Sequence, residues 1–110
     1  VTAAFNLNLL EHIKSRLDRE IDINRFSHLA YFNNVESRIE MHLVSDVRQV
    51  LCIEGRRYEL ERGETIHTEN SYKYSIDSFH QLAARAGFRP VSVWMDEEAL
   101  FSIHYLRVKV

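Results

Sequence analysis

The hydrophobic period of this chain changes near residue 38, and that change limits the folds it can adopt. Apolar side chains recur every three or four positions over residues 10–17, the spacing of a helix that buries one face. From residue 39 onward they recur every second position, the spacing of a strand with one buried face. We therefore predict an α+β fold: a largely antiparallel, four-stranded meander with an N-terminal helix packed on one face.

Local signals set the bounds of the expected elements in the first two thirds. A helix is predicted over residues 9–19, with Asn8 as its N-cap. Residues 21–29 are expected to form a loop and a short helical turn, from which Phe26 and Leu29 dock on the first helix. Strands are predicted over residues 38–43, 47–53, 58–61 and 64–74, with Gly55 as a turn residue.

The last third follows a different plan. Ser75 is expected to cap a helix that runs to Ala86, and Gly87 suits the left-handed conformation that ends it. Two strands, 90–95 and 100–109, should follow around an acidic turn. Because a two-stranded hairpin is marginal alone in water, this one needs a neighbour.

Composition narrows the classes of function. The 110 residues are 45% hydrophobic, enough for one modest core, and a net charge of −2 spread along the chain argues against a nucleic-acid partner. No apolar run approaches the roughly 20 residues that a membrane span needs, so a cytoplasmic protein is expected. Cys52, the one cysteine, and Trp94 are both predicted to be core residues.

The predicted strand over residues 64–74 carries polar groups where most strands carry packing residues. Under regular alternation, residues 67, 69, 71 and 73 share one face. Glu69 and Ser71 then present a carboxylate and a hydroxyl at a fixed separation, suited to holding a small polar ring or amide. The alternative interpretation is the solvated face of an antiparallel strand.

A metal site is a second chemistry that these residues suggest. His67 and Glu69 would share a face, and His42 could lie on an adjacent strand and complete three ligands. This spacing is not diagnostic, and the chain has no H-x-x-x-H or H-E-x-x-H motif. We therefore predict no metal site.

Four segments, in this order, resemble the histidine-specific, S-adenosylmethionine-dependent methyltransferases of the type that make trimethylhistidine for ergothioneine synthesis. The segment G-E-T-I-H-T-E-N-S-Y-K-Y over residues 63–74 is the most specific of them. The others are F-N-L-N-L-L at 5–10, R-I-E-M-H-L at 38–43 and L-F-S-I-H-Y-L at 100–106. The family's proteins are considerably longer than this chain, and in them a Rossmann-like methyltransferase domain is interrupted by a substrate-binding domain.

The resemblance implies a division of labour along the chain. Residues 1–74 would belong to the amino-acid substrate-binding domain, and residues 75–110 would supply a helix and hairpin that complete the methyltransferase sheet. Glu69 and Ser71 would hydrogen-bond the imidazole of the substrate, and Met41 would line the pocket. S-adenosylmethionine would be bound by a region absent from this chain, which has only three glycines and none in G-x-G spacing. The fragment alone is therefore expected to be inactive.

Two functions stay open at this point. The chain is either the C-terminal part of an N-methyltransferase acting on histidine or a related amino acid, or a stand-alone α+β binding or oligomerisation module without catalysis. The family usually reads R-T-E-I-S where this chain reads H-T-E-N-S, which leaves the identity of the amino acid open. Without its parent sheet the hairpin would expose an unpaired edge, so we expect the isolated fragment to form a dimer or swapped dimer.

Overall fold

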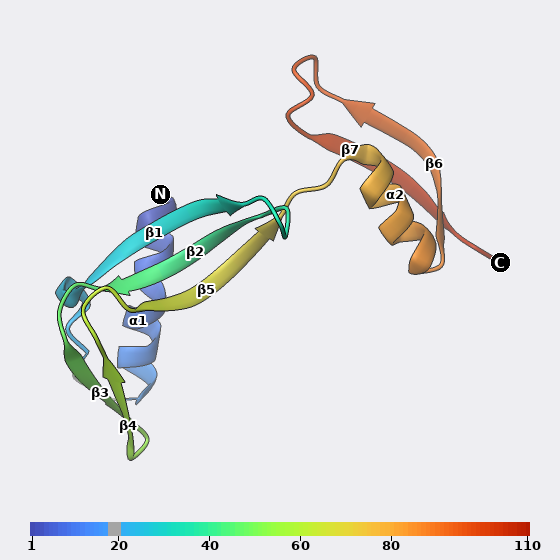
Figure 1. The fold of residues 1–110 in the computed structure, drawn as a ribbon. Helices are drawn as coiled ribbons and strands as arrows, with labels where there is room; N and C mark the ends of the chain where they lie inside the picture. Colours follow the sequence, from blue (N-terminus) through green and yellow to red (C-terminus); the bar gives the residue numbers. More distant parts are fainter. Residues whose placement is uncertain (18–20) are drawn as a thin grey trace. The chain divides into compact units, whose positions relative to one another are not determined.

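The chain folds into two compact units, residues Val1–Tyr72 and Lys73–Val110, in a computed structural model that describes residues 1–17 and 21–110. Within those described ranges the elements are two α-helices, one short 3-10 helix and three small antiparallel sheets (Figure 1). The predicted α+β class is confirmed.

The first unit is a three-stranded antiparallel sheet with a helix on one face (Figure 1). Helix α1 spans Thr2–Leu17, and the 3-10 helix η1 spans Ile23–Arg25. The strands are β1 (Phe26–Asn33), β2 (Arg38–Ser45) and β5 (Thr65–Tyr72), in the order β1-β2-β5. Strand β2 is therefore central.

Strands β3 (Gln49–Ile53) and β4 (Arg56–Leu60) form a separate hairpin between β2 and β5 in the chain. Glu54 and Gly55 make its two-residue loop, and both have positive φ, 49° and 76°. Loops of this kind match the twist of paired strands, and they favour glycine. The predicted turn glycine is confirmed.

The core of the first unit lies between α1, the sheet and the β3-β4 hairpin. Its buried apolar side chains come from every layer, so the hairpin packs against the unit although it is not part of the main sheet. They are Leu10, Ile21, Phe26, Leu43, Leu51 and Leu60.

Helix α1 begins earlier than predicted. It starts at Thr2, so Asn8 is not an N-cap; the Asn8 side chain instead lies 3.2 Å from the His12 ring. Residues 18 and 19 of the predicted helix lie outside the described residues. The early turns carry Asn6, a weak helix former, but that side chain is buried and hydrogen-bonded to the strands, which offsets its low propensity.

The four-stranded meander is wrong, because β1 was not expected and the β3-β4 hairpin is not part of the main sheet. Apolar residues are contiguous over 29–32, so β1 shows no alternation; its pairing with β2 determines its conformation. Phe26 docks in the core as predicted. Leu29 does not: it is 41% exposed and lies opposite His42, on the face away from α1.

Hairpin β3-β4 also corrects the prediction for the cysteine. Leu51 points into the core, and its neighbour Cys52 points the other way and is exposed. Cys52 is therefore not a core thiol. The apolar run around it looked continuous in sequence, but a strand at the surface buries alternate residues only.

The second unit packs helix α2 (Ile76–Arg85) on a hairpin of β6 (Phe88–Met95) and β7 (Ser102–Val108) (Figure 1). Its caps agree with prediction: Ser75 Oγ accepts a hydrogen bond from the Ser78 N–H at 3.1 Å, and Gly87 has a φ of 85°. Ser75 at the start of α2 and Gly87 after its end thus set the bounds of the helix through interactions that are local in sequence.

One face of this hairpin is not covered by α2. His104 packs on Phe79 of α2, whereas the next cross-strand pair, Trp94 and Ile103, lies on the other face. Trp94 is 57% exposed, so its predicted core position is wrong within this unit.

No helix in the described ranges of either unit is long and apolar enough to cross a bilayer.

Candidate functional site

Strand β5 carries a β-bulge in the middle of the polar segment. His67 pairs with His42, and Glu69 pairs with Met41, so Thr68 is an extra residue with no partner in β2. A bulge of this kind opposes two residues to one and interrupts the alternation of side chains. Side chains of β5 after Thr68 therefore point to the opposite face from the one that regular alternation would give them.

The predicted grouping of residues 67, 69, 71 and 73 on one face is wrong for this reason. His67 lies 2.6 Å from Asn70 Oδ1, on the face away from α1, while Thr68 and Glu69 both line a hollow against α1. Residues directly opposite each other in a ladder point to the same face. Glu69 therefore shares the α1 face with its partner Met41, and the next pair on that face is Ser71 with Ile39.

The hollow beside Glu69 has a volume of about 200 Å³. Thr68 and Glu69 form its β5 wall, and the other wall is α1: Phe5, Asn6, Asn8, Leu9 and His12. Met41 is buried next to Glu69, 9% exposed, and Ser71 is half-buried two residues further along β5, beyond the lining of the hollow. The three predicted site residues thus lie on one face of two adjacent strands.

The opposite face of the sheet holds a second carboxylate, Glu40, which is only 4% exposed. Its two oxygens accept hydrogen bonds from Tyr31 Oη at 2.6 Å, Arg38 Nε at 2.8 Å, Asn33 Nδ2 at 3.0 Å and His42 Nε2 at 3.0 Å. Arg38 also forms an ion pair with it, at 2.7 Å. Glu40 is therefore a fully used acceptor at the centre of a polar network.

These bonds fix the ionisation of the network. The hydroxyl of Tyr31, then His42 and Arg38, hold the pKa of Glu40 well below its usual range, since each favours the charged carboxylate. The same bond raises the pKa of Tyr31, because the phenol proton is held by Glu40. The Glu40 bond also raises the pKa of Arg38. Glu40 stays ionised at neutral pH and is unsuited to proton transfer.

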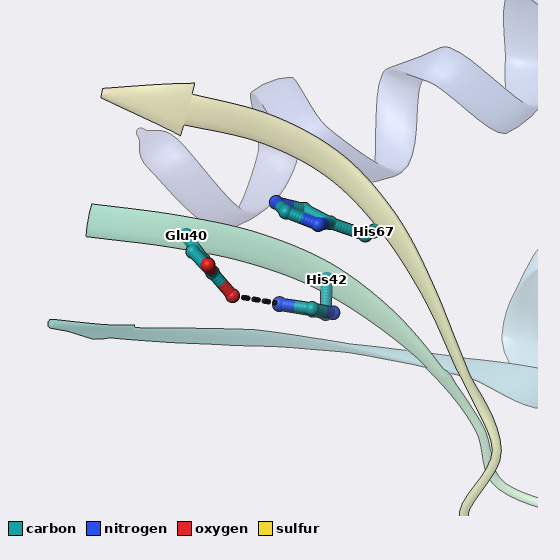
Figure 2. A group of neighbouring side chains, drawn as sticks. All are labelled: Glu40, His42 and His67. Carbon is teal, nitrogen blue, oxygen red and sulfur yellow. Dashed lines mark hydrogen bonds and ion pairs between the residues drawn. The ribbon is translucent and has the colours of Figure 1, made fainter. Parts of the chain in front are cut away.

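Glu40, His42 and His67 lie close together on this face (Figure 2). Each offers one nitrogen or oxygen atom that could bind a metal ion, and these atoms all lie within 4.8 Å of one another. The three residues weighed as possible metal ligands from the sequence, His42, His67 and Glu69, are not brought together, because the bulge puts Glu69 on the other face. The observed trio suits hydrogen bonding better than a cation. The two imidazole rings are stacked, with their centroids 4.4 Å apart and their planes at 17°, so the lone pairs in the two ring planes are nearly parallel and do not converge on one ion. In addition, Arg38 already neutralises the carboxylate.

Sequence reasoning missed Glu40 and its partners. The signal was present in R-I-E-M-H-L, where Arg38, Glu40 and His42 alternate with the apolar residues. In a central strand both faces are buried, so charged residues on one face must pair with one another. The central place of β2 cannot be predicted from the sequence, because the segment that forms β1 shows no strand alternation.

The chain belongs to the family of SAM-dependent, histidine-specific methyltransferases, whose sequence pattern matches residues 1–108. Two relatives carry the name histidine N-alpha-methyltransferase. The protein from Mycobacterium tuberculosis is 34% identical over 105 residues, and the one from Mycolicibacterium smegmatis is 33% identical over 105 residues. The resemblance seen in the four segments is confirmed.

The alignments cover nearly all of this chain but a much smaller part of each relative. Each alignment includes 94% of this chain and 33% of the relative, so the chain spans about a third of their length. An uncharacterized protein of Sinorhizobium fredii, y4iF, is also matched over about a third of its length. It is 30% identical to this chain over 107 residues, and the alignment covers 35% of it.

Proposed function

We propose that this chain is part of an S-adenosylmethionine-dependent N-methyltransferase acting on histidine or a related amino acid, and that its first unit contributes the pocket for the imidazole. The observation that carries the proposal is the placement of Glu69 beside Met41, on the same strand face as Ser71 and next to a hollow. Family membership and the names of the two mycobacterial relatives support the choice of substrate.

The chemistry of the two polar groups suits a neutral imidazole. Such a ring has one N–H donor and one acceptor nitrogen, so a carboxylate can accept from the first while a hydroxyl donates to the second. Glu69 and Ser71 would hold the ring in one tautomer and one orientation. Fixing the ring also fixes the α-amine, which is the group that must be placed for methyl transfer.

S-adenosylmethionine would supply the electrophilic methyl, and the residues that hold it belong to a part of the full-length protein outside this chain. The three glycines of the chain sit singly at turns, at positions 55, 63 and 87, rather than in a nucleotide-binding loop. On this proposal the fragment alone does not transfer methyl groups. Its role is to bind and orient the amino acid.

The two units would then serve different domains of the full-length enzyme. Unit Val1–Tyr72 would be part of the amino-acid-binding domain, and unit Lys73–Val110 would add its helix and hairpin to a Rossmann-like sheet. The exposed face with Trp94 and Ile103 supports the second assignment, because a hairpin with one uncovered apolar face needs another layer.

Kinetics of the full-length protein test the role of Glu69. We expect Glu69→Ala to raise the KM for histidine by about tenfold or more, because the ring loses its acceptor, while the affinity for S-adenosylmethionine stays unchanged. Glu97→Ala is the matched control, since it removes an exposed carboxylate from the β6-β7 turn. An unchanged KM in Glu69→Ala would remove Glu69 from the site.

The alternative function, a binding or oligomerisation module without catalysis, rests on the uncovered apolar face of the hairpin alone. Calorimetry on the full-length protein separates the two. The proposed enzyme binds both S-adenosylmethionine and histidine, whereas a module of the alternative kind binds neither.

A further inference from the structure

The β-bulge at Thr68 determines which face of the sheet carries the Glu69 carboxylate. Ile66 packs against the core on the α1 side, so regular alternation from Ile66 would turn Glu69 away from α1 and toward Glu40. With the extra residue, Glu69 faces the hollow instead. The one extra residue thus decides where the Glu69 carboxylate lies. With the bulge it lies beside Met41, and without the bulge it would lie beside the negative charge of Glu40.

Side chains, rather than the ladder alone, hold the backbone at this bulge. The register shifts between Met41 and His42, and the carbonyl oxygens of both residues accept side-chain hydrogen bonds. Thr68 Oγ1 lies 3.0 Å from the Met41 oxygen, and Asn6 Nδ2 donates to the His42 oxygen at 3.1 Å. A bulge interrupts the ladder locally, so such bonds are what stabilise one register over another.

Asn6 and Thr68 also bind each other, and through Asn6 the bulge is tied to the helix. Thr68 Oγ1 lies 2.6 Å from Asn6 Oδ1, and its single hydrogen is shared between that oxygen and the Met41 carbonyl. The Asn6 amide nitrogen lies 2.9 Å from His28 Nδ1. Asn6, 4% exposed on α1, therefore contacts β1, β2 and β5 at one point.

We infer that Asn6 and Thr68 are positioning residues, which keep the bulge in register and so hold Glu69 on the α1 face. They act through Glu69 and the backbone of β2, without contact to the amino acid required. The inference rests on the proposed function for its effect on substrate binding, but the placement of Glu69 can be tested separately.

A double-mutant cycle in the full-length protein tests the effect on binding. Thr68→Val keeps the shape of the side chain and removes its hydroxyl; Thr68→Ser keeps the hydroxyl. We expect Thr68→Val to weaken histidine binding about tenfold by calorimetry, since small misplacements of a binding group are costly, and Thr68→Ser to bind nearly as the unmodified protein does. In a Glu69→Gln background the same Thr68→Val change should cost less than about twofold, because coupled residues are not additive.

Thr65→Val is the matched control, because Thr65 begins the same strand on the unbulged side and should leave affinity unchanged. Equal losses from Thr68→Val in both backgrounds would overturn the positioning role and indicate a general loss of stability. If Glu69→Gln itself leaves histidine affinity intact, the proposed function fails instead. If Glu69→Gln weakens binding and Thr68→Val does not, only the positioning inference fails.

A crystal structure of full-length Thr68→Val tests the placement without reference to substrate. We expect the side chain of Glu69 to leave the α1 face or the bulge to shift along β5. An unchanged bulge with Glu69 in place would overturn the inference. Should Thr68→Val not fold, as a thermal melt would reveal, Thr68→Ala removes the same hydroxyl with a smaller side chain and gives the same reading.

Discussion

Two carboxylates on opposite faces of one sheet have different environments. Glu40 is buried and accepts hydrogen bonds from four side chains, including the cation of Arg38. Glu69 lines a hollow next to Met41. A carboxylate whose lone pairs all accept hydrogen bonds within the protein has a structural role, whereas a carboxylate beside a cavity can bind a ligand. Burial and charge alone would have selected Glu40 as the functional residue; its saturated bonding argues against that choice.

The Glu40 network predicts a pH dependence of stability. The folded pKa of Glu40 is depressed, mainly by Tyr31, so its stabilising contribution is fully present above the ordinary carboxyl value of 4.5 and is lost as the pH falls through the folded value. We expect Glu40→Gln to lower the melting temperature by several degrees at pH 7. The difference from the unmodified protein should shrink as the pH falls below 4.5.

Thermal melts of the full-length protein from pH 7 down to acid measure this difference directly. Glu97→Gln is the control, because that exposed carboxylate should leave both the melting temperature and its pH profile in place. A stability gap between Glu40→Gln and the unmodified protein that stays constant with pH would show that Glu40 contributes by packing and not by its charge.

Elements differ in how far their own residues determine them. Helix α2 was predicted almost to the residue, because Ser75 and Gly87 end it by chemistry that is local in sequence. Strand β1 was missed because pairing with β2 decides its conformation. The bulge was missed for a related reason: one extra residue at Thr68 becomes visible only when two strands are set in register.

The same limits apply to the candidate site. Alternation correctly put Glu69 and Ser71 on one face, since both follow the bulge, but it wrongly grouped them with His67, which precedes it. Met41 was assigned to the pocket by resemblance alone, and the register places it directly opposite Glu69. Spacing within one strand could be read from the sequence; the neighbours across the sheet could not.

The loop of the β3-β4 hairpin carries a prediction at the scale of an element. Gly55 has a φ of 76°, and a Cβ added there would meet no atom within 4 Å. Gly55→Ala should therefore destabilise the protein by about 1 kcal/mol, the cost of a left-handed conformation for a residue with a Cβ. Urea unfolding of the full-length protein measures it. A stability equal to that of the unmodified protein would mean that the loop adopts another turn.

The whole chain is a set of two compact units that each leave apolar surface exposed. In the second unit the uncovered hairpin face includes Trp94 and Ile103, together with an unpaired strand edge. Surfaces of this kind associate in water unless another layer covers them. In the full-length protein we propose that the remaining methyltransferase sheet is that layer.

Isolated from the parent protein, the fragment should therefore form a dimer or swapped dimer. Light scattering over a range of concentrations tests this, and Trp94→Glu should shift the population toward monomer because it charges the apolar face. Val50→Glu is the matched control, because Val50 is an exposed apolar residue of β3 whose neighbours Gln49 and Leu51 are the buried ones. A monomer at high concentration for the unmodified fragment would contradict the expectation.

The most direct test of the account is a crystal structure of the full-length protein with histidine and S-adenosylhomocysteine bound. We predict the imidazole on the α1 face of β2 and β5, one ring nitrogen within hydrogen-bonding distance of Glu69, the other within reach of Ser71, and Met41 beside the ring. An imidazole bound elsewhere, with Glu69 turned to solvent, would contradict the central claim.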